Sequence, residues 1–223
     1  MNKAVLMSLQ GGRRMLVAVL IVGLCVPVLL HAHPHAWIDL SVELHMDEQR
    51  QLSGLTQTWV FDPVYTLILL EELDEEHPED ARAEQLRGMA ARMITSMGDY
   101  DYLTRIEVDE ERLRATEVTN VEAQLTAGEQ LQFRFTLQLP EQVDARGSSV
   151  SYMIYDPVYY IEMLHPSADA VRLNGATDAC QVTIDEPKPD PSQIARAAAV
   201  DLGAASADGL GRHFAQRVNL QCR

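Results

Sequence analysis

Residues 33–46 read HPHAWIDLSVELHM, and this stretch decides the kind of fold that the sequence predicts. Its even-numbered residues are apolar from Ala36 to Met46, whereas its odd-numbered residues are mostly polar or charged. A period of two is typical of a strand that has one buried and one solvated face. The solvated face would carry His33, His35 and Asp39 together. The sequence therefore predicts a half-buried strand whose solvent-exposed face begins with two imidazoles and a carboxylate.

The residues before this strand have the layout of a secretory signal peptide. Three basic residues within the first 14 positions precede an apolar run over 15–30, and Ala32 offers a small residue for cleavage. The run is shorter than the ~20 residues that a membrane-spanning helix needs, and the alternative is an uncleaved signal anchor. We expect a cleavable signal peptide over 1–32 and a periplasmic protein whose first residue is His33.

The mature chain is strongly acidic. The whole sequence has a formal net charge of −15, and cleavage removes three basic residues and no acidic ones, which leaves −18. This charge argues against a nucleic-acid partner, because Lys and Arg neutralise the phosphate backbone in such complexes. It suits an exported protein that handles cations. The GxSxG, HExxH, P-loop and GxGxxG motifs are absent from the sequence, so no enzymatic activity is predicted.

The remaining pattern predicts an α+β fold with mainly antiparallel strands. Alternation is clearest over 131–139, and the other expected strands are 52–61, 102–108, 117–125, 149–155, 170–174, 180–185 and 218–222. Aspartate is a good helix N-cap and proline is favoured at the first helical position. We therefore expect helices after each Asp-Pro pair and one more in between: 63–73, 81–97, 157–164 and 191–202. The core domain would span 33–186, and a C-terminal extension of a helix and a last strand would span 187–223.

Two cysteines follow the signal peptide, Cys180 and Cys222. In an exported chain an even pair most simply forms one disulfide. Such a bridge would tie the C-terminal strand back to the core. The alternative is that both thiolates bind a metal ion, although no CxxC spacing accompanies them.

Two stretches of the chain are similar, WVFDPVY at 59–65 and MIYDPVY at 153–159. The simplest interpretation is two independent helix starts, since Asp-Pro favours them. The other interpretation is that both corners aim a carboxylate and a phenol at one shared site. The four side chains would then be Asp62 with Tyr65 and Asp156 with Tyr159.

Metal binding is the chemistry that the start of the first strand favours. Imidazole nitrogen suits nickel, cobalt, zinc and copper ions, and a freed amine at His33 would add a nitrogen to the imidazoles of His33 and His35. Asp39 would serve as a ligand or would orient an imidazole. The alternative is a histidine-rich strand edge that binds nothing. We expect His165 and His213 to be ordinary surface histidines.

These motifs resemble an exported family known as domain of unknown function 1007 (DUF1007). The resemblance rests on HPHAWID after the signal peptide, on QTWVFD at 57–62 and on YDPVYY at 155–160. It implies a periplasmic component of an uncharacterised ABC-type transport system, commonly paired with an inner-membrane permease of the nickel/cobalt-exporter type. It also extends the set of candidate metal ligands, which becomes His33, His35, Asp39, Asp62 and Asp156.

We therefore expect an accessory protein that captures or delivers a divalent ion of the nickel, cobalt or zinc class in the periplasm. One alternative is a copper redox protein with a histidine brace, which would use the amine of the first residue and two imidazoles. Another is a structural adaptor that holds a permease and binds no metal. The sequence does not distinguish the metal ions from one another, because imidazole serves them all.

Overall fold

The computed structural model describes residues 34–76, 78, 81–175, 179–201 and 206–223, and these all belong to one compact unit. The expected signal peptide and His33 lie outside the described residues. Within the described part, no helix is long and apolar enough to cross a membrane. The strands are β1 (Ala36–Met46), β2 (Gln51–Phe61), β3 (Thr104–Val108), β4 (Glu111–Leu113), β5 (Glu117–Leu125), β6 (Leu131–Asp144), β7 (Val150–Ile154), β8 (Ile161–Leu164), β9 (Val171–Asn174), β10 (Cys180–Asp185) and β11 (Arg217–Cys222). The helices are α2 (Pro63–Glu76), α3 (Arg82–Met97) and α4 (Pro191–Asp201), with 3-10 turns η1 (Gly98–Leu103), η2 (Ala168–Ala170) and η3 (Gly211–His213).

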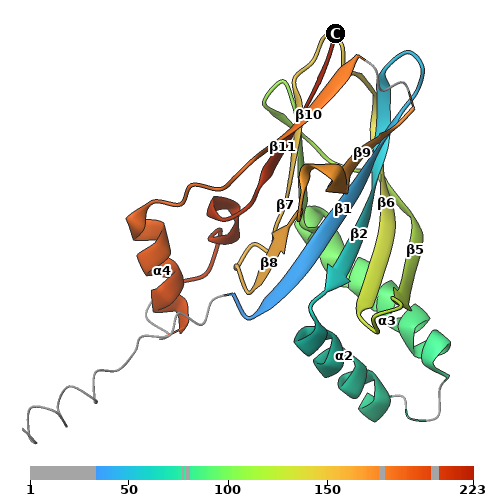
Figure 1. Cartoon of the computed structure of the whole chain (residues 1–223), viewed down its shortest axis with the longest axis vertical. Coiled ribbons are helices and arrows are strands. Elements are labelled where there is room, and N and C mark those ends of the chain that lie inside the picture. Colours follow the sequence, from blue (N-terminus) through green and yellow to red (C-terminus); the bar gives the residue numbers. More distant parts are fainter. Residues whose placement is uncertain (1–33, 77, 79–80, 176–178, 202–205) are drawn as a thin grey trace, which may run out of the picture. The chain divides into compact units, whose positions relative to one another are not determined.

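Two sheets carry this α+β fold (Figure 1). The first has the order β5-β6-β2-β1, and these four strands are antiparallel. The other edge of β1 is extended by two short parallel strands, β8 beside its first half and β9 beside its second half. The second sheet has the order β10-β11-β7-β3-β4 and is antiparallel throughout. The predicted fold class, α+β with mainly antiparallel strands, is confirmed.

The predicted alternation of β1 is also confirmed. The even-numbered residues from Ala36 to Met46 are buried, whereas Trp37, Asp39 and Ser41 are exposed. The buried face of β1 packs into a core that takes side chains from both sheets and from α3, among them Leu40, Phe133, Ile154 and Met89. The two sheets therefore share one apolar core.

One buried polar side chain connects the two sheets across this core. Gln57 on β2 is fully buried, and its amide nitrogen donates a hydrogen bond to the hydroxyl of Thr104 on β3 at 2.7 Å. Its amide oxygen accepts a hydrogen bond from the indole N–H of Trp59 at 2.9 Å. Because both ends of the amide have partners, its burial carries no large desolvation penalty. The bond to Thr104 links β2 to β3, and the bond from Trp59 holds the amide in position for it.

Helices begin at two of the three Asp-Pro pairs, as predicted. Helix α2 follows Asp62, whose Oδ1 accepts the backbone N–H groups of the next turn, Val64 and Tyr65. Helix α4 follows Asp190, whose Oδ1 accepts the N–H groups of Ser192 and Gln193 in the same way. Both aspartates therefore act as N-caps, which satisfy helix donors that have no intrahelical acceptor.

The predicted helix after Asp156-Pro157 is wrong, because the chain turns there and continues as β8. A helix would need the N–H of Ile161 to bond to the carbonyl of Pro157. In the structure that N–H donates to Asp156 Oδ2 at 3.1 Å, and the Pro157 carbonyl accepts the N–H of Gly211 at 3.2 Å. Tyr159 has a φ of 61°, which a right-handed helix excludes.

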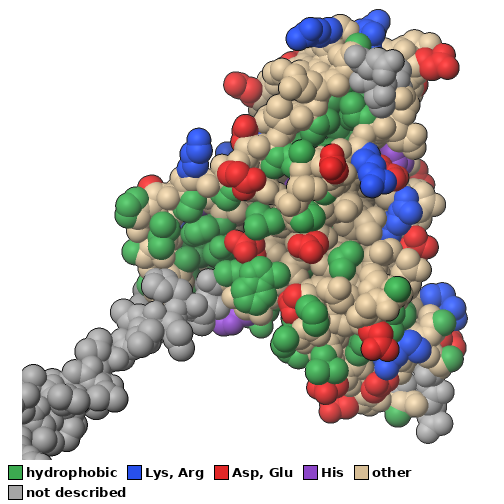
Figure 2. Space-filling model, in the orientation of Figure 1, with side chains coloured by type: hydrophobic (Ala, Val, Ile, Leu, Met, Phe, Trp, Pro, Cys, Tyr) green, Lys and Arg blue, Asp and Glu red, His purple; other side chains and the backbone are tan. Residues whose placement is uncertain are grey.

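Apolar side chains remain on the surface near the start of β1. On the face shown in Figure 2, hydrophobic side chains gather over the lower ends of β1 and β8 and over α2, with acidic side chains between them. Val64 and Leu67 of α2 are 69% and 56% exposed, and Trp37 and Tyr160 are 48% and 45% exposed. Exposed apolar groups that cluster in this way mark contact surfaces more often than scattered ones do.

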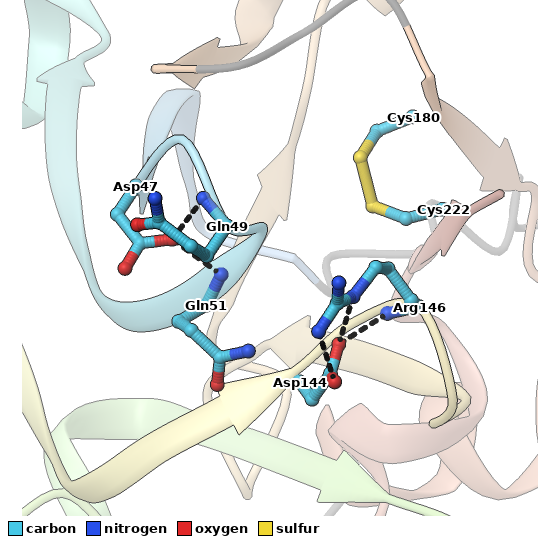
Figure 3. Close-up of a disulfide and its surroundings, with 7 residues drawn as sticks. All are labelled: Asp47, Gln49, Gln51, Asp144, Arg146, Cys180 and Cys222. Atoms are coloured by element: carbon cyan, nitrogen blue, oxygen red, sulfur yellow. Dashed lines mark hydrogen bonds and ion pairs between the residues drawn. A yellow bond between two sulfur atoms is a disulfide. The ribbon is translucent and has the colours of Figure 1, made fainter.

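The predicted disulfide is present and joins Cys180 to Cys222 (Figure 3). The two cysteines lie directly opposite one another in the antiparallel pair of β10 and β11. Strand β11 lies between β10 and β7. The last residues of the chain are thus part of the second sheet, and the bridge locks its edge strand to them.

Replacing both cysteines (C180S with C222S) should lower the free energy of unfolding by about 3–4 kcal/mol, because the bridge closes a long loop in the unfolded chain. The two cysteines are 42 positions apart. Urea denaturation followed by tryptophan fluorescence measures this difference, and the reduced wild-type protein should match the variant. A loss below about 1 kcal/mol would contradict the prediction.

Candidate functional site

Asp62 fixes the start of β1 against α2. Its Oδ1 accepts the N–H groups of Val64 and Tyr65, both at 2.9 Å, and its Oδ2 accepts the N–H of Trp37 on β1 at 3.0 Å. The Asp62 backbone N–H also donates to the Trp37 carbonyl at 3.0 Å. A carboxylate offers about four lone-pair positions, and three of them are in use here. Asp62, a predicted metal ligand, therefore acts as a backbone acceptor and has little capacity left for an ion.

Asp156 plays the corresponding part at the neighbouring strand β8. Its Oδ1 accepts the N–H of Val158 and its Oδ2 accepts the N–H of Ile161, both at 3.1 Å. Ile161 pairs with Ala36 in the parallel ladder of β1 and β8. The two Asp-Pro corners thus anchor the starts of two adjacent strands. The structure gives Asp156, like Asp62, a positioning role.

The phenol of Tyr65 lies near the carboxylates of both corners. Burial raises the pKa of Tyr65, and four neighbouring acidic groups raise it further: those of Tyr160, Glu72, Asp156 and Asp62. Tyr65 is therefore within electrostatic reach of both anchoring carboxylates. That the two corners form one shared site stays a prediction.

Tyr160, rather than the Tyr159 of the motif comparison, is the electrostatic neighbour of Tyr65. Tyr159 faces the C-terminal segment, where its ring stacks on Phe214 with centroids 4.0 Å apart and its hydroxyl donates to Glu162. The ring of Tyr160 stacks on that of His35, with centroids 4.8 Å apart and an interplanar angle of 28°. The positive φ at Tyr159 turns the chain, and nothing in the local sequence signals such a turn.

His35 lies at the exposed start of β1, where its backbone N–H donates to the Tyr160 carbonyl at 2.9 Å. Asp39 is exposed on the same face of the strand. Four residues of strand span about 13 Å, so one ion would contact both only if the two side chains leaned toward each other. Among the described residues, no three His, Cys, Asp or Glu side chains form a group that would hold a metal ion. His33, the other predicted primary ligand, is outside the described residues.

The comparisons with known proteins agree with the similarity that the motifs suggested. The family model described as "Protein of unknown function (DUF1007)" matches residues 18–222. The chain belongs to the DUF1007 family. A Haemophilus influenzae protein described as "Uncharacterized protein" is 26% identical over 204 residues, which cover 91% of this chain and 97% of that protein. Neither description names an activity.

The DUF1007 chain also contains a buried polar network around His165, which is 5% exposed. The prediction of a surface position for this histidine is therefore wrong. Its Nδ1 contacts the side-chain oxygen of Gln216 at 3.0 Å and its Nε2 meets the Tyr152 hydroxyl at 3.1 Å. An amide oxygen only accepts, so Nδ1 carries the proton and Nε2 accepts the Tyr152 O–H. Gln216 in turn donates to Glu186 at 3.0 Å, which ties β7 to the C-terminal segment.

The variant Asp62→Ala should lower the free energy of unfolding by about 1–3 kcal/mol, because it removes a helix cap and the acceptor of the Trp37 N–H. The exposed Asp39 provides a matched control, and Asp39→Ala should change stability by less than about 0.5 kcal/mol. Urea denaturation measures both, and hydrogen exchange of the Trp37 amide should be faster in the first variant alone. Equal losses in the two variants would contradict the anchoring role.

His165 should make stability depend on pH. Burial lowers the pKa of His165, against the opposing effects of Gln216 and Glu186. The unfolded chain therefore takes up a proton first as the pH falls below about 6.5. The contribution of neutral His165 is fully present above that pH and is lost as the pH falls through the folded pKa. The difference in unfolding free energy between wild type and His165→Gln should shrink between about pH 8 and pH 5, and a constant difference would contradict this.

Proposed function

We propose that this protein is a periplasmic accessory of transition-metal transport, which captures or delivers a divalent ion of the nickel, cobalt or zinc class in concert with an inner-membrane transporter. The observation that supports this proposal is the place of His35. It lies at the exposed start of β1, two residues after His33, with its ring stacked on Tyr160. Imidazole is a good ligand for each of these ions.

The ligand set would combine two neighbouring residues of an extended chain. His33 precedes His35 by two positions in the sequence, and its imidazole would be the second nitrogen ligand of the ion. Cleavage of the signal peptide would free the amine of His33 as a third nitrogen. The stacking of His35 on Tyr160 restricts the ring before the ion arrives, which reduces the entropy lost on binding.

Negative charge around this position would favour a cation. Asp62, Asp156 and Glu72 lie near the phenol of Tyr65, and α2 ends in an acidic run without a basic residue in its last turn. These groups would raise the local concentration of cations. A set of two or three nitrogens would leave coordination positions for a partner's ligands, which suits transfer better than storage.

A structural adaptor is the second candidate, and the exposed apolar side chains favour it. Val64, Leu67 and Ile68 of α2 and Trp37 of β1 are all about half exposed or more. A permease that docks here would cover them. The two candidates use the same region of the protein and differ in whether an ion is bound.

Metal titration of the mature protein separates these candidates. Isothermal titration of the chain that begins at His33 should find one nickel, cobalt or zinc ion per molecule. Replacing both histidines (His33→Ala with His35→Ala) should weaken binding at least ~100-fold, since loss of ligands costs no less than loss of the groups that orient them. The exposed His213 serves as control, and His213→Ala should bind as the wild type does.

The other outcomes point to other functions. Equal affinities in wild type and the double variant would refute the proposed ligands. Tight binding of copper alone, abolished by an extra residue before His33, would favour the histidine brace. Absence of binding for every ion would favour the adaptor.

A further inference from the structure

A cavity of about 490 Å³ lies between η1, the β3–β4 hairpin and the C-terminal segment at η3. Four arginines line it, Arg105, Arg112, Arg114 and Arg212, together with His213. Its described lining contains two acids, Asp99 and Asp101. The whole chain has a net charge of −15 and 18 Lys and Arg residues, so this cavity is a local exception to its charge.

The two acids do not neutralise the positive charge of the four arginines that line the cavity. Asp101 is shared by Arg112 at 2.5 Å and Arg114 at 3.5 Å, so one carboxylate faces two guanidinium groups. Within the described part of the chain, Arg212 forms no ion pair, and its side chain is exposed. The cavity therefore presents uncompensated positive charge.

The side chain of Arg105 is held in place by an ion pair with Glu107. Its Nε lies 2.5 Å from Glu107 Oε1, and the other oxygen of Glu107 receives Arg217 at 2.7 Å. Arg217 also donates to Ser151 at 2.8 Å. Again one carboxylate serves two arginines, and the network joins β3, β7 and β11. The floor of the cavity is thus built on the second sheet.

The backbone of one wall is strained. Asp101, Tyr102 and Leu103 have φ values of 51°, 56° and 55° in succession, a left-handed conformation that residues with a Cβ adopt at a cost in energy. The Leu103 carbonyl accepts the N–H of Tyr155 at 3.0 Å, and the Tyr102 carbonyl accepts the Thr104 hydroxyl at 2.9 Å. Strain of this kind gathers at binding sites. Here it places Asp101 where it orients two arginines.

We propose that this cavity binds a small organic polyanion of the di- or tricarboxylate class. Guanidinium groups bind carboxylates through paired hydrogen bonds. The volume falls in the range of small-ligand sites and is many times the ~30 Å³ that one water occupies, so it exceeds the need of a single inorganic oxyanion. Tyr100, Tyr155 and Leu103 add aromatic and apolar lining for a carbon skeleton. The site uses none of the residues of the proposed metal site.

Isothermal titration of the metal-free mature protein with tricarballylate, at low ionic strength, tests this assignment. This tricarboxylate lacks the hydroxyl with which citrate chelates metal ions. One molecule should bind per chain, and the variant Arg114→Gln with Arg212→Gln should bind at least ~10-fold more weakly, since it loses two charged donors. Arg87→Gln on the exposed surface of α3 is the matched control, and it should leave the affinity unchanged. The variant His33→Ala with His35→Ala should also bind as the wild type does, which separates this site from the metal proposal.

Both replaced arginines are exposed, and their thermal unfolding in the absence of ligand should match the wild type. If the double variant fails to fold, Arg212→Gln alone, at a side chain that forms no ion pair to described residues, makes the same comparison. The proposal is overturned if tricarballylate does not bind or if Arg87→Gln weakens it as much. Inorganic phosphate should bind more weakly, and equal affinity for phosphate would overturn the assignment to an organic ligand.

Discussion

The carboxylate of Asp62 accepts backbone hydrogen bonds from two different elements, the first turn of α2 and the first residues of β1. Each of these N–H groups lies at the end of an element, where its own hydrogen-bond ladder supplies no partner. One side chain therefore fixes the position of a strand and the direction of a helix at the same time. Asp156 repeats the arrangement for β8, which pairs with β1. The exposed pair of His35 and Tyr160 depends on these two carboxylates, because it lies where both strands begin.

The sequence predicted those parts of the fold that local rules govern. The alternation of β1 requires only that one face of the strand is buried. The starts of α2 and α4 require only an N-cap residue followed by proline. Both features could therefore be predicted from the sequence. The corner at Asp156 has the same local signal and forms no helix. A distant hydrogen bond decides the structure of this corner. The Pro157 carbonyl accepts the N–H of Gly211, which lies more than fifty residues further along the chain. The parallel pairing of β8 and β9 with β1 and the burial of His165 are likewise set by distant partners. No pattern in the neighbouring sequence predicts this pairing or this burial.

Side-chain chemistry was predicted less completely than the fold, for the same reason. The sequence predicted that His35 and Asp39 are exposed, and both are, His35 directly before β1 and Asp39 on it. It did not show that the carboxylate of Asp62 holds the backbone N–H of Trp37, a residue 25 positions earlier in the chain. The positively charged cavity could not be predicted from the composition, because the net charge of −15 describes the whole chain and not one region of it. Hairpin pairing places Arg112 opposite Glu107, two residues after Arg105, and Arg212 reaches the same cavity from the C-terminal segment.

The turn at Asp156 supports both regions. On one side its carboxylate holds the Ile161 N–H and thereby the start of β8. On the other side its backbone receives Gly211 so closely that a Cβ there would come within 1.8 Å of the Asp156 carbonyl oxygen. Only glycine fits that approach, and it carries Arg212 and His213 to the cavity wall. One region presents imidazole and carboxylate groups, which attract cations, and the other presents guanidinium groups, which attract anions. A single turn thus supports two regions of opposite charge, through the carboxylate of Asp156 on one side and the close approach of Gly211 on the other.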